Sequence, residues 1–493
     1  MLFNSAIFVF VYLPIVWIGY LAALRLPWAR AGIAWLGVAS IFFYGYWNPV
    51  FVPLLVLSIL FNYGAGRLLD PQAGRATPRA RKALLAGAIA ANLSALAWYK
   101  YAGLLSSSFR ALSGLDVPVI DVLLPIGISF YTFTQIAYLV DTWAGKRPEK
   151  SFTAYVLFVT FFPHLIAGPV LHHAEMMPQF MRGDRSVRYA LMIEGLLFFA
   201  LGLAKKVLIA DSVAPAANRA FTLVESVPLG FVDSWFGALA YTVQIYFDFS
   251  GYSDMAIGLA LLFGIRLPLN FNSPYKSTSI IEFWRCWHMT LSRFLRDYLY
   301  IPLGGGRHGP VRRQVNLMVT MLLGGLWHGA SWTFVVWGGL HGLYLQVNHA
   351  WRHVVERSPR LKRFLERHPS GAAFAGGTIT FTAVVAAWVF FRAESFGGAA
   401  NMLAGMFADS AAIEAQLADL HTVSYIALGL ALAFLAPNSQ QLLTGVGEKL
   451  VSDLRRPRPF LRGAHAGGLV FVIVALVLIS VSWGTNEFIY FNF

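Results

Sequence analysis

Long apolar stretches alternate with short polar loops along almost the whole chain. The first apolar window runs over Ile7–Ala23 and the last over Gly468–Trp483, and a helix needs about 20 mostly apolar residues to cross a bilayer. Hydrophobic residues make up 57% of the 493 residues and charged residues only 13%, well below the charge of soluble domains. The pattern therefore predicts a polytopic helical membrane protein. The first window follows no basic segment and precedes no small-residue cleavage site, which predicts a retained helix and not a cleaved signal peptide.

The charge of the polar loops predicts which side of the membrane each one faces, because Lys and Arg collect in cytoplasmic loops. The loops predicted to be cytoplasmic are Arg67–Lys82, Asp141–Lys150, Arg266–Asn316, Trp351–His368 and Lys449–Arg462. Both termini and the acidic loop Glu394–His421 are predicted to lie outside. The segment Lys150–Ile265 contains a loop with both signs, so its orientation stays open. The net charge of +14 is explained by these loops and does not indicate nucleic-acid binding.

The sequence LGGLWHGASWTFVVWGGLHG, Leu323–Gly342, carries two ionisable rings in an apolar, glycine-rich segment. Both flanking loops are basic and predicted to be cytoplasmic, so Leu317–Leu345 is expected to enter the membrane and return as a hairpin. His328 then lies near the middle of the hairpin, well inside the protein. Ionisable groups at membrane depth are costly and usually functional.

Two roles are open for each histidine of this segment. A neutral imidazole at His328 is suited to accept a proton from a hydroxyl nucleophile, which makes it a candidate general base. The alternative is a structural histidine that bonds a backbone carbonyl. His341 either lines the same cavity or anchors the returning helix, and we favour the anchor.

The segment Ile280–Gly309 is expected to contain an amphipathic helix at the membrane interface. On a helical wheel Arg285, His288, Ser292 and Arg296 fall on one face, opposite a group of Trp, Leu and Phe side chains. The arginines are either membrane anchors or, together with Arg307 in the glycine-rich turn, a surface for the phosphates of a soluble donor. His288 is a candidate for a position beside the pocket. The turn lacks the G-K-[ST] ending of a Walker A loop.

The run QIYFDFSGYSDMAIG, Gln244–Gly258, interrupts apolar sequence with two aspartates. One interpretation is a helix break in which Ser250, Ser253 and Asp254 cap the next helix. Asp248 is a candidate to orient a histidine. The sequence has no G-x-S-x-G elbow and no H-E-x-x-H spacing, and its single cysteine, Cys286, excludes an internal disulfide and a cysteine metal site. We therefore expect no metal.

Six motifs in this order resemble the membrane-bound O-acyltransferase (MBOAT) family, especially its bacterial branch with the alginate O-acetyltransferase membrane subunit. They are LPIGISFYTFTQIAYLVD, FFPHLIAGPVL, YFDFSGYSDMAIGL, NFNSPY, EFWRCWHMTLSRFLRDYLYIPLGGGR and MLLGGLWHGASWTFVVWGGLHG. The likeness extends over most of residues 1–493, taken as one membrane domain, and is densest over residues 124–345. Teichoic acid D-alanyl transferases resemble the chain less.

The resemblance implies an all-α polytopic fold, a ring of roughly 11–14 tilted transmembrane helices around a thinned core with a through tunnel. It implies that His328 and His288 are catalytic and that Asn270 lies near the active region. Such relatives commonly have Arg where this chain has Cys286, a side chain off the histidine face, so we expect no effect on the chemistry.

The resemblance further implies a membrane O-acetyltransferase that serves an exported polysaccharide such as alginate. The expected donor is acetyl-CoA from the cytoplasm, with no bound cofactor. The expected partners are a periplasmic SGNH-type acetyltransferase or other polysaccharide machinery and membrane lipids, and no nucleic acid. The expected location is the bacterial inner membrane with both termini periplasmic. The alternatives are D-alanyl transfer to teichoic acid from a carrier protein, and a transporter with a buried histidine relay.

Overall fold

The computed structural model describes residues 1–28, 30–73, 77–181, 189–407 and 417–446, and a few positions beyond (449, 468, 472–479, 481, 488 and 489). The described residues form helices and turns and contain no strand, as the apolar pattern predicts. The predicted loop Lys449–Arg462 lies outside these residues apart from Lys449, and the last apolar window, Gly468–Trp483, is described only in part. The chain divides into two compact units.

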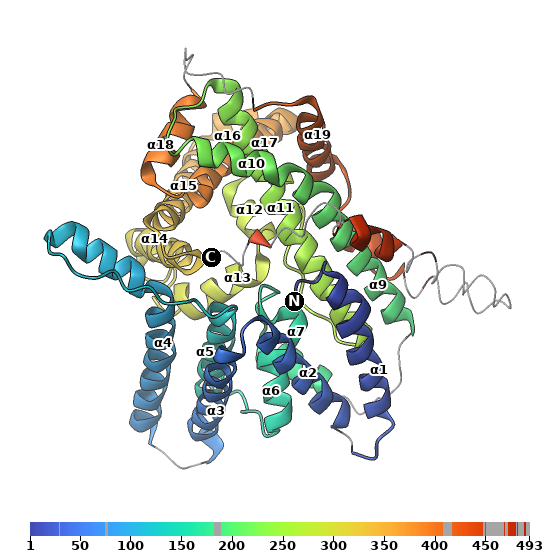
Figure 1. The fold of residues 1–493 in the computed structure, drawn as a ribbon. Helices are drawn as coiled ribbons and strands as arrows, with labels where there is room; N and C mark the ends of the chain where they lie inside the picture. The colour runs from blue at the N-terminus through green and yellow to red at the C-terminus, as the bar shows by residue number, and fades with distance from the viewer. Residues whose placement is uncertain are drawn as a thin grey trace. The chain divides into compact units, whose positions relative to one another are not determined.

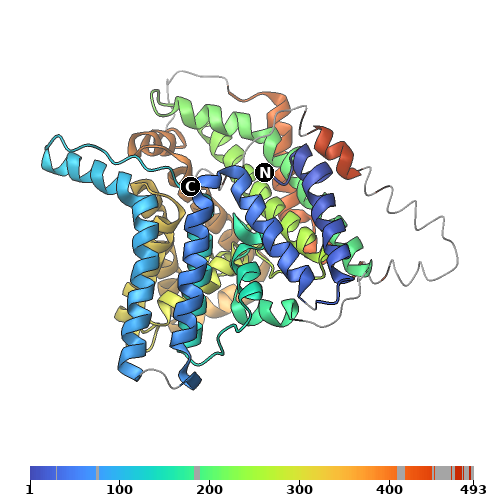
Figure 2. The ribbon, with the colours of Figure 1, turned by 60° about the horizontal axis from the view of Figure 1, so that its bottom comes forward.

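Unit 1 comprises residues 1–203, 252–268 and 443–492. Helices α3, α4 and α5 pack side by side, and α1 and α2 form an antiparallel pair (Figures 1 and 2). Reciprocal amide hydrogen bonds of 2.9 and 2.8 Å between Asn62 and Asn92 join α3 to α4. The elements are η1 (Phe8–Tyr12), α1 (Leu13–Leu24), α2 (Ala31–Trp47), η2 (Pro49–Phe51), α3 (Val52–Leu69), η3 (Pro71–Ala73), α4 (Pro78–Ser113), α5 (Ile128–Trp143), α6 (Phe152–Thr160), α7 (Phe162–Leu165), α8 (His173–Phe180) and α9 (Tyr189–Ala204).

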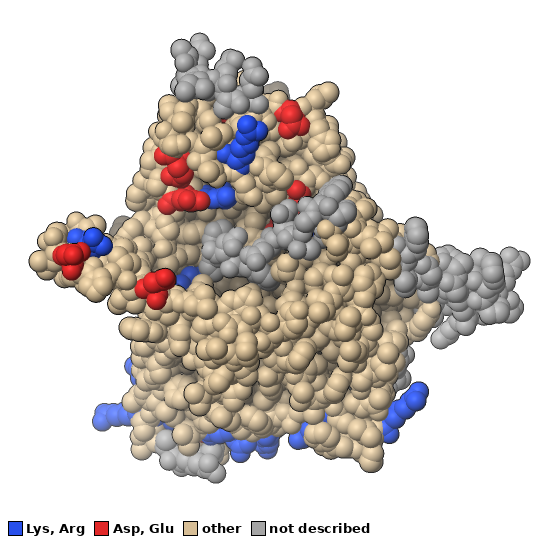
Figure 3. All heavy atoms as spheres, in the orientation of Figure 1, with Lys and Arg blue, Asp and Glu red and all other residues tan. Residues whose placement is uncertain are grey.

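The basic loops of unit 1 lie at one end of its helices. The helix ends that border the α1–α2 and α3–α4 connections are at the bottom of Figure 1, and Figure 3 shows Lys and Arg side chains along that edge. Arg25, Arg30, Arg67, Arg79 and Lys82 are exposed in this region of the chain. This clustering is the arrangement that the positive-inside rule requires of cytoplasmic loops.

Unit 2 comprises residues 204–251 and 269–442, with Phe493. Its elements are η4 (Lys205–Ala210), α10 (Asp211–Leu223), η5 (Pro274–Lys276), α12 (Ile280–Cys286), α13 (Met289–Leu295), η6 (Arg296–Tyr300), α14 (Gly309–His328), α15 (Trp332–Arg357), α16 (Pro359–Arg367), α17 (Pro369–Arg392), α18 (Phe396–Gly405), α19 (Leu420–Leu435) and α20 (Ser439–Leu443). Helix α11 (Phe231–Leu262) belongs to unit 2 up to Gly251 and to unit 1 from Tyr252.

Two described helical segments, Pro49–Leu69 and Pro369–Arg392, are long and apolar enough to cross a bilayer. Shorter apolar helices cover Phe8–Leu24, Ala31–Trp47 and Leu420–Leu435.

The predicted interface helix is wrong as a single element. It divides into α12 and α13 at His288, whose φ of 42° is left-handed. The extended segment that contains Asn270 and Asn272 forms backbone hydrogen bonds with the chain on either side of the break. Met289 N donates to Asn270 O and Asn272 N donates to Cys286 O, both at 2.9 Å. The predicted shared face is therefore absent, because Arg285 is exposed whereas His288 is buried.

The predicted helix break in Gln244–Gly258 is also wrong, because α11 runs through it without interruption. The run contains no proline, and its two glycines, Gly251 and Gly258, are seven residues apart, so each is an isolated glycine of the kind a helix tolerates. Ser250, Ser253 and Asp254 therefore lie inside a helix and cap no new one.

Candidate active site

The helical hairpin predicted from the charge pattern is present in unit 2. Helices α14 and α15 pack closely along their length, and the turn between them follows His328 (Figure 1). Ser331 caps α15, since its Oγ accepts a hydrogen bond of 3.3 Å from Thr333 N. Near the turn the two backbones touch: a methyl group on Gly325 would overlap Phe334 O, and one on Gly338 would overlap Met321 O. The glycines therefore allow the close approach that positions the end of α14.

His328 is the last residue of α14, and only 3% of it is exposed. Aromatic rings surround it. Its ring centroid lies 5.0 Å from those of Trp327 and Trp337 and 5.1 Å from that of Phe391, each in an edge-to-face arrangement. The imidazole thus lies in a buried, aromatic setting supplied by α14, α15 and α17. In such surroundings electrostatic interactions and hydrogen bonds are stronger than in water.

His288 lies next to His328, with 6.4 Å between the ring centroids. It is fully buried, and its Nδ1 is 3.0 Å from Asn270 Oδ1. Thr290 N and Thr290 Oγ1 also contact this Oδ1, at 3.4 and 2.9 Å. A backbone N–H can only donate, which identifies the amide atom as the oxygen. Nδ1 must then donate to it, so the neutral ring of His288 carries its lone pair on Nε2, the nitrogen suited to accept a proton.

The structure thus brings together the three residues that the motifs associate with activity, His328, His288 and Asn270. The left-handed backbone at His288 is uncommon for a residue other than glycine, and such conformations persist where the surroundings enforce them. Phe249 of α11 packs edge-on against the His288 ring at 4.8 Å between centroids. Sequence reasoning missed Thr290 and Phe249, because neither stands out by type or spacing.

His341 has the geometry of an anchor. It is fully buried on α15, and its Nδ1 accepts a hydrogen bond of 3.2 Å from Trp284 Nε1 of α12. Its ring lies 4.8 Å from that of Trp337, which separates it from His328. Because the lone pair on Nδ1 is committed to the indole, His341 connects α12 to α15 and its neutral ring has no second acceptor nitrogen.

The carboxylate of Asp248 lies 2.8 Å from Lys206 Nζ, and Lys206 is also 2.8 Å from Asp211. All three side chains are at least nine-tenths buried. Lys206 thus bridges two carboxylates, one of them Asp248, and the next residue, Phe249, contacts the His288 ring. Sequence reasoning missed Lys206 and Asp211. Their charges beside the apolar run Val207–Ala210 were the available signal.

The candidate donor-binding arginines are all exposed, but they occupy three elements: Arg285 on α12, Arg296 on η6 and Arg307 in the turn before α14. Arg296 binds its neighbour Asp297, with Nε–Oδ1 and Nη2–Oδ2 distances of 2.7 and 3.2 Å. Cys286 is partly buried. Among the described residues no cluster of three His, Cys, Asp or Glu side chains is placed to hold a metal ion.

Comparison with known proteins identifies the family. The membrane-bound O-acyltransferase family profile matches residues 146–387. The chain is 42% identical to the peptidoglycan O-acetyltransferase of Helicobacter pylori over 82% of its own length and 80% of that protein's. It is also 42% identical to a probable alginate O-acetylase of Pseudomonas aeruginosa, over 83% of this chain and 75% of the relative. A teichoic acid D-alanyltransferase of Streptococcus thermophilus is 26% identical, over 54% of this chain and 68% of the relative.

The chain therefore belongs to the membrane-bound O-acyltransferase family. It is an acyltransferase and an integral membrane protein.

Proposed function

We propose that this protein is an O-acetyltransferase that moves acetyl groups from acetyl-CoA towards a polysaccharide outside the cytoplasm. The observation that carries the proposal is the pair of buried histidines, His328 and His288, 6.4 Å apart between ring centroids in an aromatic surround. Relatives named for O-acetyl chemistry match the chain at 42% identity over most of its length, which supports an acetyl group.

In the proposed reaction His328 acts as the general base. Its neutral imidazole accepts the proton of an acceptor hydroxyl while the hydroxyl oxygen forms a bond to the thioester carbonyl carbon. The carbon–sulfur bond then breaks, and the imidazolium returns the proton to the leaving thiolate. His288, held by Asn270 through Nδ1, presents its Nε2 beside the reacting groups and fixes their orientation.

The donor side of the proposal rests on exposed arginines. Arg285, Arg296 and Arg307 contact the phosphates of the donor, where charge-assisted hydrogen bonds are strong. Glutamine at all three positions is expected to raise the donor's KM about tenfold, roughly 1.4 kcal/mol of lost binding. The matched control replaces Arg360, Arg363 and Arg367 of α16, which are also exposed, and should leave the KM unchanged. An equal effect of both triples would reduce the first set to membrane anchors.

The proposal places the chain in the bacterial inner membrane with both termini periplasmic, and places its active site in a tunnel through a ring of tilted helices. The acceptor is the hydroxyl of a periplasmic SGNH-type acetyltransferase or of the polysaccharide itself. The distribution of Lys and Arg supports this orientation. Reporter fusions at Gly74 and Glu448 should both read cytoplasmic, and a periplasmic signal at either position would overturn it.

D-alanyl transfer to teichoic acid is the second candidate, supported by the 26% identity to a D-alanyltransferase over about half of the chain. A histidine-relay transporter is the third, and the acyltransferase family assignment counts against it.

Incubation of purified protein in vesicles with radiolabelled acetyl-CoA or D-alanyl carrier protein separates the candidates. We expect acetyl transfer to a polysaccharide or to an SGNH-type partner. Transfer of D-alanine alone would establish the second candidate, and transfer of neither group by folded protein would favour the third. In cells, deletion of this chain should remove base-labile acetyl groups from the exported polymer.

A further inference from the structure

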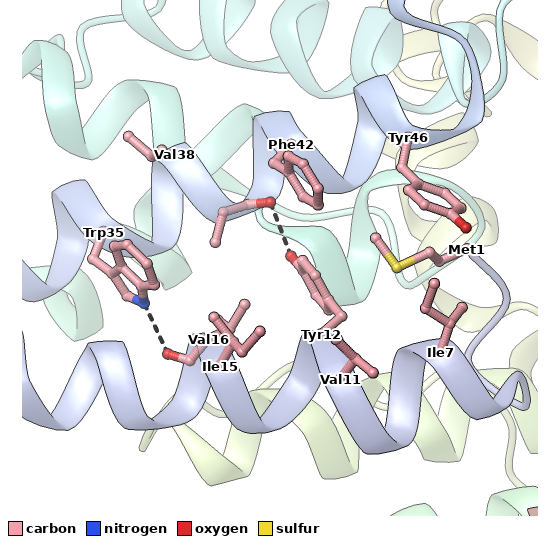
Figure 4. Close-up of a pocket in the computed structure, with 11 residues that line it drawn as sticks. Met1, Ile7, Val11, Tyr12, Ile15, Val16, Trp35, Val38, Phe42 and Tyr46 are labelled. Atoms are coloured by element: carbon pink, nitrogen blue, oxygen red, sulfur yellow. Dashed lines mark hydrogen bonds between the residues drawn. The ribbon is translucent and has the colours of Figure 1, made fainter.

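An apolar pocket of about 380 Å³ lies in unit 1 between the first two membrane helices. Its wall consists of Met1, one stripe that runs from Ile7 through η1 into α1, and one stripe on α2, both stripes at helical spacing (Figure 4). The lining residues are Met1, Ile7, Val11, Tyr12, Ile15, Val16, Trp35, Val38, Ala39, Phe42 and Tyr46. None of these residues belongs to the proposed catalytic machinery, which lies in unit 2.

Two hydrogen bonds fasten the helices on either side of the pocket. Tyr12 donates its hydroxyl to Ala39 O at 2.9 Å, and Trp35 donates its indole N–H to Val16 O at 2.8 Å (Figure 4). The bonds run in opposite directions, one from each helix, and use the polar atoms of both side chains. Tyr12 is the last residue of the π-helical turn η1. The remaining wall is apolar, so the pocket selects an occupant that needs no hydrogen bond.

Exposure shows from which side an occupant enters. Ile15, Val38 and Phe42 line the pocket yet are 56%, 62% and 61% exposed, so the pocket opens on the outer surface of the helix pair. For an integral membrane protein that surface meets hydrocarbon. A helix with its side chains is about 10–12 Å across, too wide for this volume. At the packing density of protein interiors the same volume holds on the order of a dozen methylene groups.

We propose that this pocket binds one acyl chain of a membrane phospholipid. The headgroup lies at the end marked by Tyr46 and the adjacent Trp47, because Tyr and Trp prefer the membrane interface. The chain then runs between α1 and α2 towards Trp35. The basic α1–α2 connection, with Arg25 and Arg30, is at the opposite end of both helices, so the lipid belongs to the leaflet on the N-terminal side.

The test uses full-length protein in nanodiscs whose phospholipid carries a diazirine near the end of one acyl chain. After irradiation, mass spectrometry should find label near Val16 and Trp35 in excess of that on Leu57, an exposed residue of α3 outside the pocket. Ile15→Trp fills the pocket and should reduce this label to the Leu57 level. Ile18→Trp, on the exposed side of α1 outside the pocket, should preserve it.

Equal labelling of the wild type and both variants, or no excess over Leu57, would overturn the proposal. If Ile15→Trp is not recovered as folded protein, Val38→Phe fills the pocket from the α2 side and gives the same readout. A second copy of the chain as occupant is tested with Val38→Cys in a Cys286→Ser background. Efficient dimer formation with loss of the lipid label would replace the acyl chain by a protein partner.

Discussion

The α1–α2 pair of unit 1 and the α14–α15 hairpin of unit 2 are both apolar helix pairs rich in aromatic residues, but they differ in two respects. In α1–α2, side-chain hydrogen bonds from Tyr12 and Trp35 to backbone carbonyls fasten the helices around an apolar pocket. In α14–α15, glycines bring the backbones into contact and the turn displays His328 among aromatic rings. Hydropathy alone therefore does not distinguish the helix pair for which we propose a lipid site from the pair for which we propose catalysis. The two pairs differ in where their polar atoms lie.

The largest expected effect comes from removal of the ionisable ring at the hairpin turn. His328→Ala should lower acyl transfer by about 10²–10⁴-fold, the usual contribution of a positioned general base. The protein should remain in the membrane at near-normal amount. The measurement is the initial rate of acetyl transfer by purified protein, with abundance determined in membranes.

His328→Gln provides the matched polar variant without useful basicity, and His308→Ala, at an exposed position before α14, should change the rate little. Normal activity of a stable His328→Gln protein would end the general-base proposal. A purely structural histidine would instead lower abundance when replaced by Ala.

Unit 2 also differs in that it contains buried full charges, where Lys206 bridges the carboxylates of Asp211 and Asp248. Lys206→Met leaves Asp211 and Asp248 buried without their shared cation, and removal of one partner of a buried pair costs about 3–5 kcal/mol. We expect a marked loss of thermal stability in detergent. Lys205→Met is the neighbouring control: it removes a 2.6 Å hydrogen bond to Ser439 Oγ and should cost only about 1 kcal/mol. Similar melting temperatures for the two variants would contradict a structural requirement for the bridge.

The close backbone contact of α14 and α15 can be opened by one methyl group. Gly338→Ala places Cβ against Met321 O, and overpacking of this kind costs about 1–3 kcal/mol. Gly339→Ala, one residue on, meets a leucine methyl at 3.4 Å and should be neutral or slightly stabilising. Thermal unfolding measures both. A Gly338→Ala protein as stable and active as the wild type would show that the hairpin tolerates wider spacing.

The smallest effect is expected at α1–α2. Tyr12→Phe removes the hydroxyl that donates to Ala39 O and keeps the ring, so the cost should be about 1 kcal/mol. Activity should be unchanged because the site lies in unit 2. Trp35→Phe removes the hydrogen bond from the indole N–H to Val16 O and should lower the free energy of unfolding by a similar amount. A strong loss of activity in Tyr12→Phe, with stability preserved, would contradict the distinction between a packing pair and a catalytic hairpin.

The class of fold and the buried position of His328 were predictable because they depend on local patterns. Apolar windows predict membrane helices, and loop charge predicts that Leu317–Leu345 turns back on itself, as α14 and α15 do. A histidine in such a segment is conspicuous by its type alone, which made His328 a candidate before any contact was known. The pairing with His288 required the family motifs as well.

Only the tertiary structure decided how the remaining residues act. A helical wheel assumes an unbroken helix, but the backbone at Asn270 and Asn272 forms hydrogen bonds with Met289 N and Cys286 O, and the helix is interrupted at His288. The His288 ring is then buried against Asn270. The charges of α11 suggested a break, but Lys206, distant in sequence, binds Asp248 and the helix continues. Periodicity reports which face of one element is apolar. Other features depend on atoms that other elements contribute, and no local pattern contains those atoms. They include the tautomer of a buried histidine, the neutralisation of a buried carboxylate and the space between two helices.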